Sequence, residues 1–123
     1  DHDEKWYQDV KKEAVGLDVQ VLLRKPTPEP GLRHSTTMPN MDFWRYINAL
    51  SDQNEDFDLI MVDGRARNLC FQRAVYHVRN SGYIILHDSE RKVYDECREV
   101  AKSHGFTMTE IVEGRSTLIC QQP

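Results

Sequence analysis

The chain has 123 residues, of which 39% are hydrophobic and 29% charged, and its formal net charge is −4. This length allows one domain with one core, and the acidic balance is unlike that of nucleic-acid-binding proteins, which carry a basic face. There is no apolar run of the roughly 18 residues that a membrane span needs, and three widely spaced cysteines without a CxxC pair are typical of reduced thiols, so we expect a cytoplasmic protein.

A helix is predicted at the start of the chain, over residues 1–16. Asp3 or His2 can cap it, because a side-chain acceptor there satisfies the free N–H groups of the first turn. Gly16 favours a left-handed helix end. The residues of its predicted packing face recur at helical spacing: Trp6, Val10 and Ala14. Residues 18–23 then alternate and predict a strand.

The segment 25–40 holds four of the five prolines and predicts a long loop. Loops of this length are usually binding loops, lids or plain connections, and the sequence leaves these alternatives open. Residues 42–50 predict a helix, whose apolar side chains fall on one face: Phe43, Tyr46, Ile47 and Leu50.

Two short apolar runs follow, within residues 57–62 and 83–86, and a helix is predicted between them over 68–78. Short apolar runs separated by a helix favour parallel strands buried on both faces. Asp63 directly follows the first strand, and Asp88 comes just after the second. Because ligands bind outside the carboxyl ends of strands in open α/β sheets, these two carboxylates are expected on one rim of one crevice.

The rest of the chain predicts a turn at residues 80–82, a helix over 91–103 and two strands at 106–112 and 116–120. A tight turn of the sequence Glu-Gly-Arg separates the last two strands. A hairpin that closes a run of β-α units gives a mixed sheet with an antiparallel edge.

Three segments resemble motifs of class I S-adenosylmethionine-dependent methyltransferases. Residues 62–67, VDGRAR, are similar to the family's VDGRxR segment, and residues 86–94, LHDSERKVY, to its LHDSxRxxY segment. Residues 1–7, DHDEKWY, look like its acidic-His-Asp-x-x-Trp-Tyr segment. The resemblance implies one α/β domain over 1–123, with a Rossmann-like, partly parallel sheet, helices on both faces and a C-terminal antiparallel hairpin.

The same resemblance implies S-adenosylmethionine as cofactor, with Asp1 on its ribose hydroxyls and Asp63 among its ligands. The family's glycine-rich loop would precede Asp1, and one strand would lie between the segments 18–23 and 57–62. Another chain, another segment or a homo-oligomeric partner would supply that strand. The alternatives are a fragment, or a domain that keeps the fold without the activity.

Asp63 and Asp88 have three interpretations. They can hold Mg²⁺, which needs only one or two carboxylates beside substrate and water, with Ser89 adding an oxygen; they can have a catalytic role; or they can cap the following helices. His87 is a candidate general base, because its ordinary pKa lies near neutrality, or a hydrogen-bonded rim histidine. No nucleic acid or membrane partner is expected.

Arg65, Arg67 and Arg91 lie beside this acidic rim in the sequence. Arginine forks match carboxylate or phosphate, so these residues are candidate ligands of an anionic substrate; the alternative is that they pair with the acidic residues and fix the loops. The expected function is methyl transfer to an oxygen nucleophile of a small or sugar-like acceptor. The alternative is a non-catalytic structural or interaction module.

Overall fold

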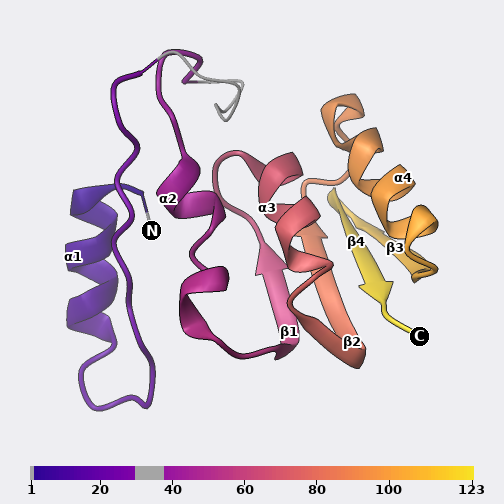
Figure 1. The fold of residues 1–123 in the computed structure, drawn as a ribbon, viewed down its shortest axis with the longest axis horizontal. Coiled ribbons are helices and arrows are strands. Elements are labelled where there is room, and N and C mark those ends of the chain that lie inside the picture. The colour runs from indigo at the N-terminus through magenta and orange to yellow at the C-terminus, as the bar shows by residue number, and fades with distance from the viewer. Residues whose placement is uncertain (1, 30–37) are drawn as a thin grey trace.

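A four-stranded mixed sheet forms the centre of the computed structural model, which describes residues 2–29 and 38–123 (Figure 1). The strand order is β1-β2-β4-β3. The elements are α1 (Glu4–Glu13), α2 (Trp44–Ile47), η1 (Ser51–Gln53), β1 (Phe57–Val62), α3 (Arg67–Ala74), β2 (Val78–His87), η2 (Lys92–Tyr94), α4 (Asp95–Ser103), β3 (Thr107–Glu113) and β4 (Arg115–Gln121).

The pairing of the strands confirms the expected α/β sheet with a C-terminal antiparallel hairpin. β1 runs parallel to β2, with Ile60 opposite Ile84 and Val62 opposite Leu86. β4 runs antiparallel to both β2 and β3. Gly114 joins β3 to β4 with a φ of +78°, a conformation that glycine adopts without steric cost.

The core lies on one face of this sheet. Side chains alternate between the two faces of a strand, and on β1, β2 and β4 one set is buried against α3 and α4, which stand in front of the sheet in Figure 1. This set and its helix partners form one cluster of buried side chains, which includes Ile60, Val62, Phe71, Ala74, Ile84, Leu86, Cys97, Ala101, Leu118 and Cys120.

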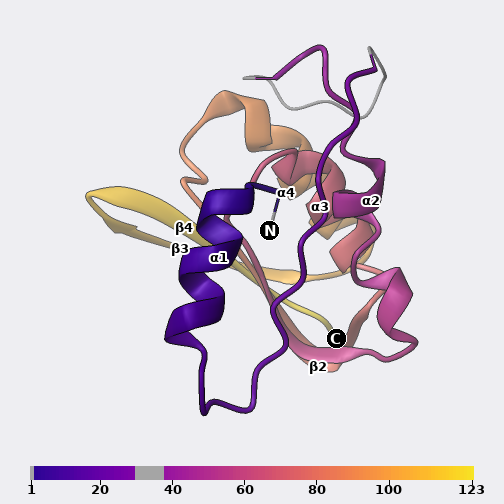
Figure 2. The ribbon, with the colours of Figure 1, turned by 90° about the vertical axis from the view of Figure 1, so that its left-hand side faces the viewer.

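The other face of the sheet is open in the described part of the chain. Leu59 and Met61 on β1 are 56% and 61% exposed, and Tyr83 on β2 is 41% exposed. We expect helices on both faces, but α3 and α4 pack on the same one. Figure 2 shows α1 on the side away from α2 and α3, and α1 buries none of its residues; its expected packing residue Trp6 is 65% exposed.

Asp3 caps α1 as expected, since its Oδ1 accepts from the backbone N–H of Trp6 at 3.0 Å. The predicted strand over residues 18–23 is wrong, because these residues form no strand in the structure. An isolated antiparallel bridge outside the named strands joins Thr27 to Asp42. Of the predicted loop 25–40, residues 30–37 lie outside the described residues.

The predicted turn at residues 80–82 is also wrong, because β2 runs through it. Ser81 has a φ of +64°, and the register with β1 shifts between Phe57 and Leu59. The turn chemistry therefore produces a β-bulge instead of a reversal. Gly82 is required there, because an added Cβ would lie 2.8 Å from the carbonyl oxygen of Arg79. No helix among the described residues is long and apolar enough to cross a membrane.

Candidate functional site at the carboxyl ends of β1 and β2

Three segments meet at one rim of the sheet. The loops that follow β1 and β2 lie together there because the two strands are parallel and adjacent. β4 is antiparallel to β2, so its first residues reach the same rim, and Thr117 is opposite His87. The rim therefore combines the two expected carboxylates, Asp63 and Asp88, with the side chain of Arg115.

Asp88 is at the centre of the rim and is only 2% exposed. Its Oδ1 accepts from Nη1 of Arg115 at 2.9 Å, and its Oδ2 accepts from Arg67 at 3.1 Å and from Arg91 at 3.0 Å. Burial raises the pKa of this carboxyl, but hydrogen bonds from Arg115 and Arg67 outweigh burial, so the pKa is lowered. Asp88 is therefore a buried carboxylate held by three guanidinium groups.

Arg67 makes four hydrogen bonds and a further ion pair inside the protein. Nε donates to the carbonyl oxygen of Gly64 at 3.0 Å, and Nη1 to the carbonyl of His87 at 2.6 Å and to Asp88 at 3.1 Å. Nη2 lies 3.3 Å from the carbonyl oxygen of Asp63 and 3.2 Å from its Oδ1. The Arg67 side chain is 12% exposed and directs these contacts at protein groups, so its geometry is that of a clamp between the segment after β1 and the end of β2.

Neither carboxylate caps a helix in the described structure. The residue before α3 is Ala66, and no side chain caps that helix, η2 or α4. The capping interpretation of Asp63 and Asp88 is therefore wrong. The Asp63 side chain is 48% exposed and pairs with Arg67 through Oδ1, which leaves Oδ2 as an acceptor at the surface of the rim.

The rim does not fit Mg²⁺. Both oxygens of Asp88 already accept from guanidinium groups, and a divalent cation there would lie beside three positive charges. Ser89 is fully buried, and its hydroxyl donates to Oε1 of Glu110 at 2.9 Å. This contact does not suit its expected role as an oxygen ligand of Mg²⁺. No group of three or more His, Cys, Asp or Glu residues in the described chain could hold a metal ion.

His87 is half-buried, and both of its ring nitrogens face protein groups. Nδ1 lies 3.3 Å from Oγ1 of Thr117, and Nε2 lies 3.5 Å from Oδ1 of Asp88. Consecutive strand residues point to opposite faces, so sequence reasoning gave no reason for Asp88 to orient this ring. Asp88 reaches it because its φ of +56° takes the backbone out of the extended conformation directly after β2.

An aromatic group lies beside the loop after β1, and sequence reasoning missed it. The rings of His2, Phe43 and Tyr46 lie within 5.8–6.1 Å of one another, measured between centroids. A Cβ added to Gly64 would overlap the Tyr46 hydroxyl, so a larger residue there requires Tyr46 to move. Burial raises the pKa of Tyr46 to about 12, and a backbone hydrogen bond from Arg65 to this hydroxyl opposes the rise.

Only part of an S-adenosylmethionine site falls within the described residues. Asp1, the expected partner of the ribose hydroxyls, lies outside them. Asp63 offers a half-exposed carboxylate, and the rings of His2 and Tyr46 are flat surfaces next to the same loop. A carboxylate and aromatic faces suit the polar groups and the base of a nucleoside, so the residues that are present fit this cofactor.

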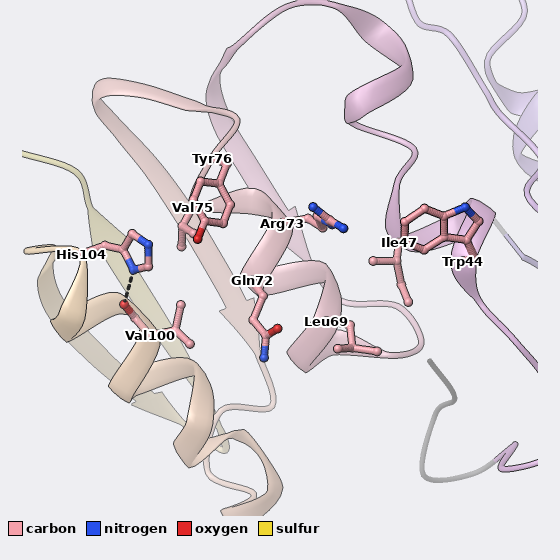
Figure 3. Close-up of a pocket in the computed structure, with 9 residues that line it drawn as sticks. All are labelled: Trp44, Ile47, Leu69, Gln72, Arg73, Val75, Tyr76, Val100 and His104. Carbon is pink, nitrogen blue, oxygen red and sulfur yellow. Dashed lines mark hydrogen bonds between the residues drawn. The ribbon is translucent and has the colours of Figure 1, made fainter. Parts of the chain in front are cut away.

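A hollow of about 390 Å³ lies elsewhere, on the outer side of α2, α3 and α4 (Figure 3). Arg73 lies 5.7 Å from the ring centroid of Trp44 at one side of it, and Tyr76 meets His104 edge-on at 5.5 Å at the other. None of the rim residues lines this hollow. The charges and hydrogen bonds that can act chemically are at the rim, so we place the candidate site there.

No family model and no curated protein matches the chain. Among solved structures, a methyltransferase-like protein from Silicibacter pomeroyi matches all of this chain and 66% of its own, with a TM-score of 0.60 and 16% identity. A methyltransferase from Pyrococcus furiosus matches 98% of this chain and 59% of its own, with a TM-score of 0.58 and 15% identity. An O-methyltransferase family protein from Burkholderia thailandensis matches 62% of this chain over 33% of its own length, with a TM-score of 0.43 and 16% identity.

The first two likenesses show that the described chain has the fold of methyltransferases. Identities this low support the fold alone. The chain spans 33–66% of the lengths of these three structures.

Proposed function

We propose that the protein transfers a methyl group from S-adenosylmethionine to an oxygen nucleophile of a small or sugar-like acceptor. The observation that carries this proposal is the Asp63 carboxylate, which presents one oxygen at the carboxyl end of β1 in a methyltransferase-like fold. Ligands of open α/β sheets bind at this rim. The arginine-held Asp88 and His87 lie directly beside it.

In this proposal Asp63 is the catalytic base. Its outer oxygen accepts a hydrogen bond from the acceptor hydroxyl, which fixes the nucleophilic oxygen in place. Asp63 would take the hydroxyl proton as the acceptor oxygen is methylated and would release it to water. The cofactor would supply the methyl group as an electrophile. Arg67 keeps the carboxylate in position through Oδ1, and His87 with Thr117 forms the wall on the β4 side.

The cofactor would contact Asp1 through its ribose and the rings of His2 and Tyr46 through its base. We derive no step through Mg²⁺, since three guanidinium groups already surround the carboxylate that would bind it.

We also propose that a further strand completes the sheet at the outer edge of β1. Another segment, another chain or a second copy would supply it. This edge has no strand partner in the described residues, and β1 exposes Leu59 and Met61 on the open face. An unpaired edge beside exposed apolar side chains favours pairing with another strand.

The test is transfer of a radiolabelled methyl group from S-adenosylmethionine to a panel of hydroxylated acceptors by the natural full-length protein. Asp63→Asn should lower kcat at least about 100-fold, the range of a lost general base. Asp58→Asn is the matched control, because Asp58 lies on the same strand at its other end and also pairs with an arginine, Arg79, at 3.0 Å. Equal activities of the two variants would refute the role of Asp63.

A non-catalytic methyltransferase-like module is the second candidate, and the open apolar face of the sheet favours it. Calorimetric titration with S-adenosylmethionine separates the two. Binding in the micromolar range supports the enzyme, and no heat at millimolar ligand supports the module.

A further inference from the structure

We propose that Arg91 and Arg115 form a two-pronged site for an anionic group, a phosphate or a carboxylate, and that Asp88 is the residue that positions both prongs. The further inference that this anionic group belongs to the methyl acceptor rests on the proposed function. Arg115 was not among the residues that the sequence pointed to.

The two guanidinium groups are fixed side by side by one carboxylate. Arg115 donates through Nη1 to Oδ1 of Asp88 at 2.9 Å, and Arg91 donates through Nη2 to Oδ2 at 3.0 Å. Asp88 itself is 2% exposed and is held from below by Arg67. The carboxylate therefore fixes the positions of both guanidinium groups. Arg91 reaches it from the loop after β2, and Arg115 from the start of β4.

Each of these two arginines has donors to spare. Each spends one N–H on Asp88, and no other hydrogen bond of either side chain occurs in the described residues. The Arg91 side chain is 52% exposed and that of Arg115 is 65% exposed. A guanidinium carries five donors in a planar fork, so the pair offers several N–H groups to solvent.

The three arginines of this cluster differ in how many hydrogen bonds they make. Arg67 is 12% exposed and makes four hydrogen bonds at the rim, as a structural clamp does. Arg91 and Arg115 each make one, so these two outer arginines are the part of the cluster with donors for a ligand.

The free donors of this pair favour an anion at this position. Asp63 is paired with Arg67, and Glu90, a charged neighbour of Arg115, accepts from the backbone N–H of Ser116 at 3.0 Å. Three guanidinium groups therefore face three carboxylates, and attraction for a ligand comes from the unused N–H groups of the two exposed forks. Such forks bind the paired oxygens of phosphate or carboxylate.

The first test is binding of inorganic phosphate, and separately of acetate, to the natural full-length protein, measured by thermal unfolding at constant ionic strength against chloride. We expect phosphate to raise the Tm of the wild type and to bind at least tenfold more weakly to Arg91→Gln and to Arg115→Gln. Arg115→Lys, which keeps the charge and loses the fork, should fall between. Arg79→Gln is the matched control, since Arg79 is half-exposed and pairs with Asp58 at the other end of the sheet.

No stabilisation by phosphate or acetate beyond that of chloride would overturn the proposal, and so would an equal loss of binding in Arg79→Gln. The second test separates this site from the proposed function. With an anionic acceptor, Arg115→Gln should raise KM at least tenfold with kcat unchanged, and with a neutral acceptor it should change neither. Phosphate binding without any methyl transfer would refute the proposed methyltransferase function and support the anion site. Methyl transfer with an unchanged KM for the anionic acceptor in Arg115→Gln would support the proposed function and refute the role of Arg115 in binding the acceptor.

Discussion

Nη1 of Arg67 lies 2.6 Å from the carbonyl oxygen of His87, so a side chain at the start of α3 holds the end of β2. The same nitrogen contacts the Asp88 carboxylate at 3.1 Å. Two parallel strands are thereby tied at the rim where the candidate site lies.

Arg67→Gln should lower the free energy of unfolding by about 3–5 kcal/mol, because removing one partner leaves a buried charge less well compensated. Denaturant titration measures this change. The matched control Arg79→Gln removes an exposed pair with Asp58 and should change the free energy by less than about 1 kcal/mol. Similar losses in both variants would show that Arg67 does not tie the rim.

The stability of the wild type should fall in acid through Asp88. Its pKa is lowered in the folded state, because the arginine hydrogen bonds outweigh burial. The stabilisation is therefore complete above the ordinary carboxyl pKa of about 4 and is lost as the pH falls through the lowered folded pKa. Tm measured from about pH 7 to about pH 2.5 should drop more steeply below about pH 4 in the wild type than in Asp88→Asn; parallel curves would contradict the assignment.

Gly64→Ala should destabilise the protein by about 1–3 kcal/mol, the usual cost of overpacking. The added Cβ would overlap the hydroxyl of Tyr46. In a Tyr46→Phe background that oxygen is absent, so the same substitution should cost less there. A double-mutant cycle in denaturant measures the coupling, and additive effects would show that the hydroxyl is not the obstacle.

The three cysteines should resist alkylation in the folded protein. Burial raises the pKa of Cys70 and of Cys97 to about 12, and that of Cys120 to about 11. The thiolate is the reactive form, and it is scarce at neutral pH. Mass spectrometry after iodoacetamide treatment should show labelling only in denaturant. Rapid labelling of Cys97 under native conditions would mean that the α3–α4 layer opens readily.

The 123-residue chain on its own should self-associate through the open face and the free edge of β1. Leu59→Lys combined with Met61→Lys should reduce the association seen by sedimentation velocity. Val112→Lys is the control, since Val112 is 73% exposed on the far edge strand β3. A monomer in the wild type would contradict this expectation.

The sequence predicted those parts of the fold whose partners are close in the chain. Residues 57–62 form a strand as expected, because a short apolar run followed by Asp-Gly has few alternatives. The hairpin formed as well, with Gly114 at the turn. The strand prediction for residues 18–23 failed because alternation of apolar residues indicates a strand only if another strand pairs with it. The turn prediction at Ser81 and Gly82 failed because residues that favour turns also form β-bulges.

The location of the candidate site could be predicted from the sequence, but the hydrogen-bond partners of its side chains could not. Asp63 and Asp88 share a rim, as two parallel strands require. Sequence alone could not show that Arg67 makes four hydrogen bonds while the Arg91 side chain makes one, since both are arginines near acidic residues. Arg115 had a usable signal: the first residue of a strand antiparallel to β2 must lie at the carboxyl end of β2.

The contacts of Asp88 also impose an order on folding. Arg67 and Arg115 are 21 and 27 residues away from it in the chain, so the pocket of positive charge cannot form until the hairpin has paired with β2. Contacts between distant residues form late, because closing the intervening loop must precede them. The charged cluster should therefore be complete during refolding only after β4 has paired with β2.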